Sequence, residues 1–112
     1  MHQLGYFYIL TNTHNTVLYC GATDDLYKRV FEHKNGMYTK SFTSRYNISK
    51  LVYFEVFSLP NDAFAREKQM KAGSRKKKVD LIEKMNPEWK DLTELLAGHK
   101  GEELIRIKKH FK

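Results

Sequence analysis

A carboxylate falls on the apolar side of a predicted helix, where a purely structural residue is not expected. Over residues 63–70, a rotation of 100° per residue puts Ala63, Phe64 and Met70 on one side, with Glu67 inside that stripe. An unpaired buried carboxylate costs several kcal/mol. Glu67 is therefore expected to be paired with a divalent metal or an arginine, to be protonated, or to lie in a cleft, unless the helix is rotated so that it is exposed.

Four more side chains with useful chemistry are predicted to gather near this carboxylate. Arg29 and His33 lie one turn apart on a predicted helix, and Tyr8 and Tyr19 lie on strands predicted to pair. The link between the second strand and the helix is short, so Tyr19, Arg29 and His33 are expected to share one cleft with Glu67. Taken singly, such tyrosines are usually packing residues and such a histidine is usually inert.

Positive charge is concentrated in two parts of the chain. The net charge is +7, and residues 28–50 and 66–84 carry a clear excess of Lys and Arg. Clustered basic side chains bind polyanions through counterion release, although they also occur as solubilising surface. We expect the two blocks to form two walls of a nucleic-acid-binding surface, with contacts from Lys28, Lys34, Lys40, Arg45, Lys71, Arg75, Lys76 and Lys77.

Composition limits the class of protein. The chain has 112 residues, 41% of them hydrophobic, which predicts one folded domain with a real core. Its one cysteine, Cys20, excludes an internal disulfide and a cysteine-based zinc site. No apolar run approaches the roughly 18 residues of a membrane span, and no signal-peptide pattern opens the chain. These features lead us to expect a cytoplasmic protein with no membrane partner.

The elements that must position these side chains follow from the hydrophobic pattern. Strand composition is found at residues 4–10, 17–20 and 51–57, and a polar turn cluster at 11–16 makes the first two a hairpin. Helical patterns follow at about 24–35, 61–72 and 75–85. This order predicts an α+β sandwich in which helices flank a small three-stranded sheet, mixed or antiparallel. A short amphipathic segment then precedes a last helix, so residues 1–97 are assigned to the domain and 98–112 to a C-terminal helical extension.

Local signals predict where the elements begin and end. Gly21 is expected to break the second strand, and Thr23 or Asp24 to cap the first helix. Asn61 and Ser74 are the expected caps of the next two helices. The core stripes are predicted to contain Leu26, Tyr27, Val30 and Phe31 on the first helix and Val79, Ile82 and Met85 on the third.

The order of these residues resembles the GIY-YIG nuclease superfamily. The two motif tripeptides are Tyr6-Phe7-Tyr8 and Tyr19-Cys20-Gly21, and a helical Arg29, His33 and a later Glu67 follow. The segments 18–21, 28–33, 65–71 and 86–92 resemble most closely the small single-domain, YhbQ-like bacterial members, which are similar to the N-terminal incision domain of UvrC.

The resemblance implies a metal-dependent endonuclease with a role in repair or recombination. DNA is the expected substrate, and RNA is the alternative that a basic cleft with exposed aromatic side chains could also serve. The resemblance implies that Tyr19, or else Tyr8, positions or deprotonates the attacking water and that Glu67 binds Mg²⁺ or Mn²⁺. It also implies that Arg29 binds the phosphate and that His33 orients the tyrosine or water or relays a proton. Gly21 would allow a sharp turn between strand and helix.

The chain departs from the family pattern at three positions. Tyr6 replaces the first glycine, Ala22 stands where many relatives have lysine, and Val79 stands where several have a supporting asparagine, with Asn86 farther on. One alternative is therefore a catalytically weak or inactive nucleic-acid-binding module, and another is a structural, partner-binding protein. Few residues follow Leu92, so a homodimer or a protein partner is expected to supply specificity.

Overall fold

A three-stranded antiparallel sheet forms the centre of the molecule. The computed structural model describes residues 3–35 and 47–96. Strand β1 (Gly5–Thr11) lies between β2 (Leu18–Thr23) and β3 (Lys50–Phe57) and pairs antiparallel with both. Every residue of β1 is buried, as its run of aromatic and aliphatic side chains predicts for a strand covered on both faces.

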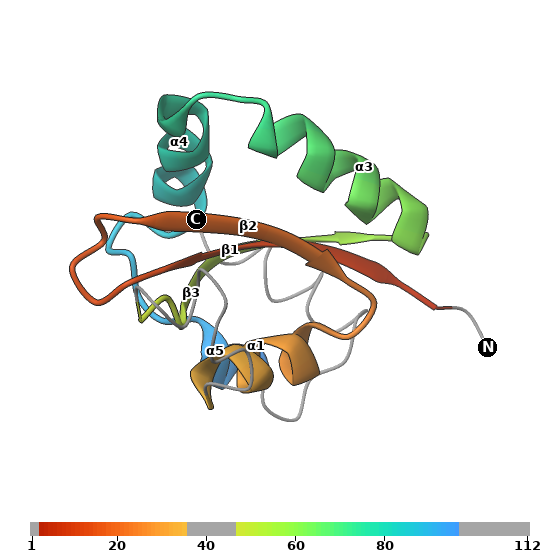
Figure 1. Ribbon diagram of the computed structural model, residues 1–112, viewed down its shortest axis with the longest axis horizontal. Helices are drawn as coiled ribbons and strands as arrows, with labels where there is room; N and C mark the ends of the chain where they lie inside the picture. The colour runs from red at the N-terminus through yellow and green to blue at the C-terminus, as the bar shows by residue number, and fades with distance from the viewer. Residues whose placement is uncertain (1–2, 36–46, 97–112) are drawn as a thin grey trace.

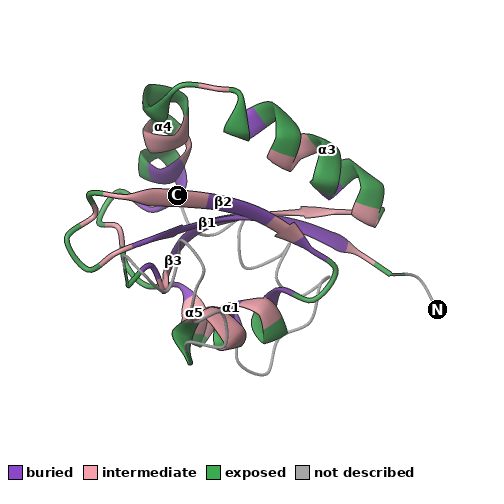
Figure 2. Ribbon diagram, viewed as in Figure 1, coloured by how far each residue is buried: buried purple, intermediate pink, exposed green. Residues whose placement is uncertain are grey.

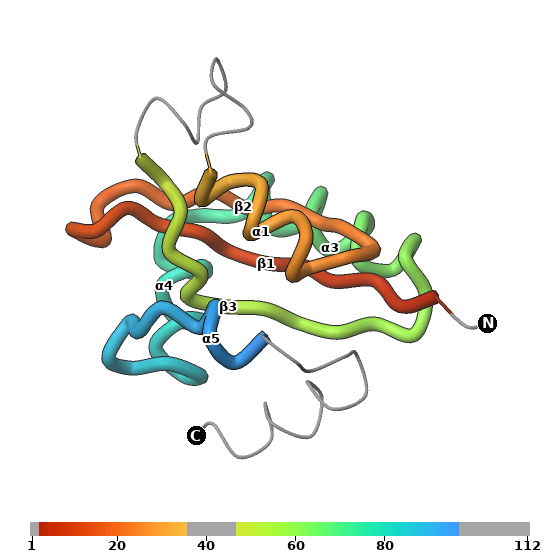
Figure 3. The backbone as a smooth tube through the Cα atoms, turned by 90° about the horizontal axis from the view of Figure 1, so that it is seen from below, coloured from red at the N-terminus to blue at the C-terminus, as the bar shows by residue number. Residues whose placement is uncertain are grey.

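Helices cover both faces of the sheet. Helices α3 (Pro60–Lys71) and α4 (Arg75–Met85) lie on one face, and α1 (Leu26–Lys34) and the short α5 (Thr93–Leu96) lie on the other (Figure 1). Figure 3 shows α1 and α5 together on the same side of the sheet. Burial is concentrated on the strands and on the helix sides turned toward them (Figure 2). The predicted α+β sandwich and its element order are thus confirmed.

The hairpin between β1 and β2 is closed by one asparagine. Asn12 Oδ1 accepts hydrogen bonds from the backbone N–H groups of Thr16 at 2.8 Å and Val17 at 3.1 Å. Buried Thr11 donates its hydroxyl to the Val17 carbonyl at 2.8 Å. These bonds close the turn, so the predicted hairpin forms with Tyr8 paired to Gly21.

The expectation that Gly21 breaks the second strand is wrong. β2 continues through Gly21 to Thr23, because each of these residues still pairs with β1. The helix cap moves accordingly: Asp25, rather than Thr23 or Asp24, accepts a hydrogen bond from Lys28 N at 3.2 Å. Thr23 instead accepts from the Asp25 N–H at 3.1 Å, which orients the capping residue.

The packing stripe of α1 is narrower than predicted. Leu26 and Val30 are buried, but Tyr27 and Phe31 are about half exposed. In this short helix one i,i+4 pair covers the sheet, and each residue that follows one of the pair is turned about 100° away from it.

The later helices confirm one expected cap and contradict another. Ser74 caps α4 by accepting from Lys77 N at 3.2 Å, and Ile82 and Met85 are buried as predicted. α3 begins one residue before Asn61, with Leu59 as N-cap and Pro60 in its first turn.

The C-terminal part of the chain and the length of the helices bear on two further predictions. The predicted extension 98–112 lies outside the described residues, and the division at residue 97 stays a prediction. Within residues 3–35 and 47–96, no helix has the length and apolar character needed to cross a bilayer.

Candidate active site

The side chains predicted to do chemistry meet at the β2 edge of the sheet. A cleft of about 380 Å³ opens there, lined by Tyr8, Tyr19, Arg29 and Glu67 among others. His33 completes the group through its contacts with the two tyrosine rings. These five residues, called the cleft cluster below, come from β1, β2, α1 and α3. Tyr8, Tyr19, Arg29 and Glu67 line this cleft, and His33 lies against the two tyrosine rings. The structure therefore brings the five side chains together, and their functional roles stay predictions.

Gly21 creates the space in which the Tyr8 hydroxyl lies. Tyr8 and Gly21 are opposite each other in the sheet, and a Cβ at position 21 would lie 2.4 Å from both Cζ and Oη of Tyr8. The tyrosine therefore reaches across β2 to the cleft only because this residue has no side chain. The role of Gly21 is close approach within a strand rather than the sharp turn that the resemblance implied.

The two tyrosines and His33 form one aromatic cluster. Tyr8 Oη lies 3.5 Å from His33 Nε2, and the ring centroids of Tyr19 and His33 are 5.6 Å apart. Burial lowers the pKa of His33 below 6.5, and the Arg29 charge lowers it further, while Glu32 opposes both effects. Burial and the Arg29 charge thus favour the neutral imidazole over the charged form, and a neutral imidazole is able to accept a proton from a phenol or water.

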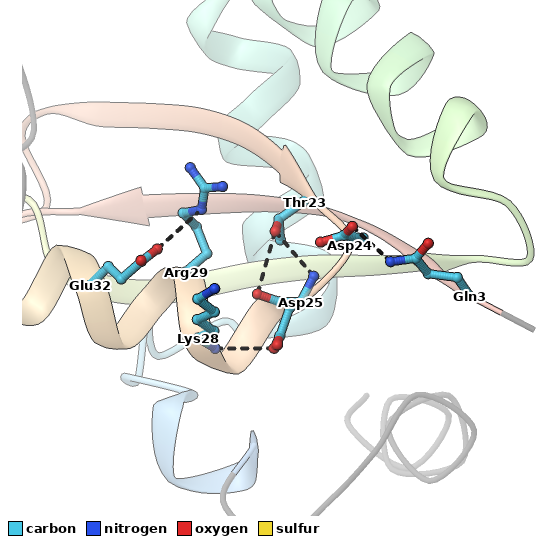
Figure 4. Close-up of a pocket in the computed structure, with 7 residues that line it drawn as sticks. All are labelled: Gln3, Thr23, Asp24, Asp25, Lys28, Arg29 and Glu32. Atoms are coloured by element: carbon cyan, nitrogen blue, oxygen red, sulfur yellow. Dashed lines mark hydrogen bonds and ion pairs between the residues drawn. The ribbon is translucent and has the colours of Figure 1, made fainter. Parts of the chain in front are cut away.

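Arg29 is held at the mouth of the cleft by α1. Its Nε lies 3.5 Å from Glu32 Oε1 one turn later, and its side chain remains accessible. Figure 4 shows the polar pocket next to the cleft, where Arg29 projects from α1 near the start of the helix. In the same view Asp24 accepts a hydrogen bond from Gln3 at 2.7 Å. An accessible guanidinium between two polar hollows is suited to an oxyanion ligand.

Glu67 lies at the border between the core and the cleft. It falls between buried Ala63 and Met70 on α3, as the helical wheel predicts, but its side chain is 23% exposed because this part of α3 borders the cleft. Its partner is Lys71, whose Nζ lies 2.9 Å from Glu67 Oε2 and 5.8 Å from the Tyr19 ring centroid. The ion pair is the main reason that the pKa of Lys71 is raised.

The arginine next to Glu67 in the sequence serves a different carboxylate. Arg66 donates from Nε at 2.9 Å and Nη2 at 3.0 Å to Glu55 on β3. Tyr53 also donates to Glu55, and burial together with this hydrogen bond raises the pKa of Tyr53. An arginine partner for Glu67, one of the sequence-based alternatives, is therefore not found among these contacts, since its ion pair is with Lys71.

The residues present are compatible with a hard divalent cation held mainly by solvent and substrate. Within residues 3–35 and 47–96, no three His, Cys, Asp or Glu side chains are grouped to enclose a metal. Mg²⁺ usually keeps several waters and binds through one or two carboxylates together with substrate phosphates. Glu67 is open to the cleft, which Asp24 also lines, so one carboxylate is available there to a cation of this kind.

The two basic blocks lie on opposite faces of the sheet. Of the first block, the described residues Lys28, Arg29 and Lys34 are on α1, whereas the second block is on α3 and α4 on the other face (Figure 1). Among the described residues, the two blocks can therefore act as two walls only where both border the β2 edge. Several of the predicted nucleic-acid contacts already have partners in the fold. Lys34 pairs with Asp91 at 2.7 Å, Lys76 with Asp80 at 2.9 Å, and Arg75 donates to the Asn15 carbonyl at 3.3 Å.

The other predicted contacts differ in their placement. Lys71 is at the cleft, and Lys28 and Lys77 are exposed. Lys40 and Arg45 lie outside the described residues. For all eight positions, contact with nucleic acid stays a prediction.

Asn86 has a structural role. Its Nδ2 donates to the carbonyls of Val52 at 3.1 Å and Lys90 at 2.9 Å, and its Oδ1 accepts from Lys90 N at 3.0 Å. The buried amide therefore fastens the loop after α4 to β3, the edge strand opposite the cleft. Asn86 therefore does not take the place of the supporting asparagine that several relatives have at the position of Val79.

Several residues that line the cleft were not identified from the sequence as site residues, Phe64 and Asp24 among them. Phe64, expected in the core, is 47% exposed and lines the cleft one turn before Glu67. Asp24, expected to be a helix cap, also lines the cleft. Phe64 precedes Glu67 by three residues, and this spacing was the available signal that the two share a helix side.

Comparison with known families defines the class of protein that this fold and cleft represent. The model of the GIY-YIG catalytic domain matches residues 4–80, a range that contains the whole cleft cluster. The chain therefore belongs to the GIY-YIG family of nuclease domains.

The more particular likeness is to proteins named UPF0213. One from Syntrophus aciditrophicus is 40% identical over 83 residues, which are 74% of this chain and 93% of that protein. One from Bacillus pumilus is 37% identical, covering 74% of this chain and 83% of that protein. The solution NMR structure of UPF0213 protein BH0048 from Bacillus halodurans is 27% identical, with a TM-score of 0.50, and the match covers 83% of this chain and 97% of that one. The resemblance stated from the motifs is confirmed, and the name UPF0213 specifies no activity.

Proposed function

We propose that this chain is a divalent-metal-dependent endonuclease that hydrolyses phosphodiester bonds in DNA, in a repair or recombination process. The observation that carries the proposal is the convergence of the cleft cluster from four elements at one accessible edge of the sheet. Two phenols, a guanidinium and a carboxylate border one hollow, and an imidazole lies against both phenol rings.

Each member of the cluster has a role that its surroundings support. Arg29 binds the non-bridging phosphate oxygens, and its planar donors remain fixed while negative charge develops on them. Glu67 holds the divalent cation, Mg²⁺ or Mn²⁺, which when bound supplies Lewis-acid stabilisation of that charge. Lys71, beside Glu67, adds positive charge at the same end of the cleft.

The tyrosines and His33 position the attacking water and remove its proton. The hydroxyl of Tyr19 or of Tyr8 orients the water. As the water oxygen bonds to phosphorus and the P–O bond to the leaving strand breaks, the phenol receives a proton from the water and gives its own proton to His33 Nε2, which lies 3.5 Å from Tyr8 Oη. The leaving oxygen takes a proton from solvent. The direction of the His33 pKa shift matches a base rather than a fixed cation.

A nucleic-acid-binding module without useful catalysis is the second candidate. Lys71 already neutralises Glu67, and Ala22 and Val79 replace side chains that many relatives carry. This candidate predicts salt-sensitive binding of DNA without turnover in any metal.

A cleavage assay distinguishes the two candidates. Supercoiled, nicked and branched DNA are incubated with the protein in Mg²⁺ or Mn²⁺, beside Glu67→Ala and Arg29→Ala. The endonuclease proposal predicts metal-dependent cleavage that both variants lose. Cleavage that survives in both variants would contradict the assignment, and binding without cleavage by the unaltered protein would establish the second candidate.

A further inference from the structure

Phe64 is an apolar ring in an otherwise polar cleft. Its side chain is 47% exposed, whereas the two core residues on the packing side of α3, Ala63 and Met70, are buried. It lines the cleft together with Glu67, Arg29 and the two tyrosines. The hydrolysis proposed above assigns no role to a half-exposed phenyl ring beside a phosphate-binding site. We therefore ask which part of a bound nucleic acid the ring could contact.

Its position on α3 matches the geometry of a nucleotide. Residues three apart on a helix are neighbours, with Cβ atoms about 5–6 Å apart. Phe64 therefore lies on the same side of α3 as Glu67, one turn nearer its N-terminus. In a nucleotide the base is separated from the phosphate by one sugar, so a phosphate between Arg29 and Glu67 brings an adjacent base to the level of Phe64.

We propose that Phe64 is a stacking subsite for a nucleobase next to the bound phosphate, and that the base must be free of its own neighbour on that face. The proposal rests on the proposed function in that it takes the cleft as the phosphate site. Inside a continuous duplex both faces of a base are covered by adjacent base pairs. The preferred nucleic acid is therefore one with an unpaired or end-exposed base, such as a single strand, a flap or a nick.

The charge around the ring fits this ligand. Cationic Arg29 and the uncharged Phe64 ring line the same cleft, and Lys71 adds a second cation through its ion pair with the cleft residue Glu67. Proteins that bind single strands commonly combine a cationic groove for the backbone with aromatic rings for the bases, and base stacking tolerates any sequence.

The exposed rings of α1 provide a matched control. Phe31 is 52% exposed, much like Phe64. It lies about 160° around α1 from Arg29, on the side away from the cleft. A general effect of exposed aromatic surface would involve Phe31 as much as Phe64, whereas a base subsite involves Phe64 alone.

The test measures binding rather than cleavage. In the Glu67→Gln background, fluorescence anisotropy gives the affinity for a short single-stranded oligonucleotide and for copies in which each base in turn is an abasic site. We expect one abasic position to weaken binding roughly 5- to 150-fold, the range of base stacking on an aromatic ring. In Phe64→Ala and Phe64→Leu, an abasic site at that position should no longer weaken binding. In Phe64→Tyr the weakening should return, and in Phe31→Leu it should equal that of the unaltered residue.

Three results would overturn the subsite. The first is that no abasic position has an effect on binding that depends on Phe64. The second is that Phe64→Leu retains the full effect of the abasic site. The third is that Phe64→Ala changes from dimer to monomer on sedimentation while the effect of the abasic site is unchanged. The last result would assign the ring to a contact with a second copy of the chain. Because cleavage is not the readout, DNA cutting by Glu67→Gln would contradict the proposed function while leaving the base subsite intact.

Discussion

Replacing Gly21 by alanine tests whether the cleft depends on the exact reach of Tyr8. The new Cβ would lie 2.4 Å from Cζ and Oη of Tyr8, and ordinary van der Waals contact begins near 3.4 Å. Tyr8 is buried between its strand neighbours, so its ring must shift by about 1 Å, the difference between these two distances. The hydroxyl then moves relative to His33 and the cleft.

The structure sets the size of both effects. Overpacking of this kind costs about 1–3 kcal/mol of unfolding free energy, and a 1 Å misplacement of a reacting group costs on the order of 10² in rate. Gly21→Ala should therefore fold, melt several degrees lower and cleave about a hundredfold more slowly. Tyr8→Phe removes the same hydroxyl, so the double variant should be no slower than the slower single variant.

Gly73 supplies the matched control. A Cβ at that position makes ordinary contacts, with the Met70 carbonyl at 3.4 Å, Lys77 Cδ at 3.5 Å and the Gln69 carbonyl at 3.7 Å, so Gly73→Ala should keep both stability and rate. The readouts are single-turnover nicking of plasmid DNA and thermal denaturation. An unchanged cleavage rate in Gly21→Ala, or equal losses in Gly73→Ala, would refute the reasoning.

Three further predictions concern pH, metal and stability. Burial first, and then the Arg29 charge, lowers the pKa of His33 in the folded protein below 6.5. As the pH falls below 6.5 the unfolded chain therefore binds more protons than the folded one, and the free energy of unfolding declines. Denaturant titrations at several pH values should show a flatter decline for His33→Gln. Lys71→Met removes the ammonium that competes for Glu67, so half-maximal cleavage should need several-fold less Mg²⁺. Asp91→Ala loses the Lys34 ion pair and the hydrogen bond from Leu51 N, so unfolding free energy should fall by about 1 kcal/mol with an unchanged cleavage rate.

Each of these predictions has a result that contradicts it. The His33 explanation fails if the pH dependence of stability is the same in His33→Gln as in the unaltered protein. An unchanged or higher Mg²⁺ requirement in Lys71→Met would show that the ion pair does not oppose metal binding. A slower cleavage rate in Asp91→Ala at full stability would place that loop in the site rather than in the scaffold.

The arrangement of the site could be predicted because it depends on periodicity and on short connections. The strand patterns, the turn after residue 10 and the helical spacing of Arg29 and His33 were enough to bring the cleft cluster together. Glu67 was identified by a local conflict, a carboxylate on an apolar stripe. The structure retains that conflict as a partly buried side chain at the cleft.

The errors arose where tertiary contacts override local signals. Gly21 is a strand breaker by propensity, yet pairing with β1 carries the strand through it, and the real reason for glycine is the Tyr8 ring on the neighbouring strand. Phe31 and Phe64 were assigned to the core by hydrophobicity, but the width of the helix face that meets the sheet decides burial. The ion pair of Lys71 with Glu67 was likewise not predicted, because Lys71 lies in a block of basic residues that was expected to bind nucleic acid.

The most direct test of the central claim compares Glu67→Gln with Glu83→Gln, a matched change at an exposed position on α4. Single-turnover cleavage and equilibrium binding of the same flapped DNA are measured in Mg²⁺ and in Mn²⁺. If Glu67 holds the metal in a nuclease site, Glu67→Gln loses about a hundredfold or more of the cleavage rate while binding persists, and Glu83→Gln matches the unaltered protein. Equal cleavage by all three proteins would contradict a metal site at Glu67.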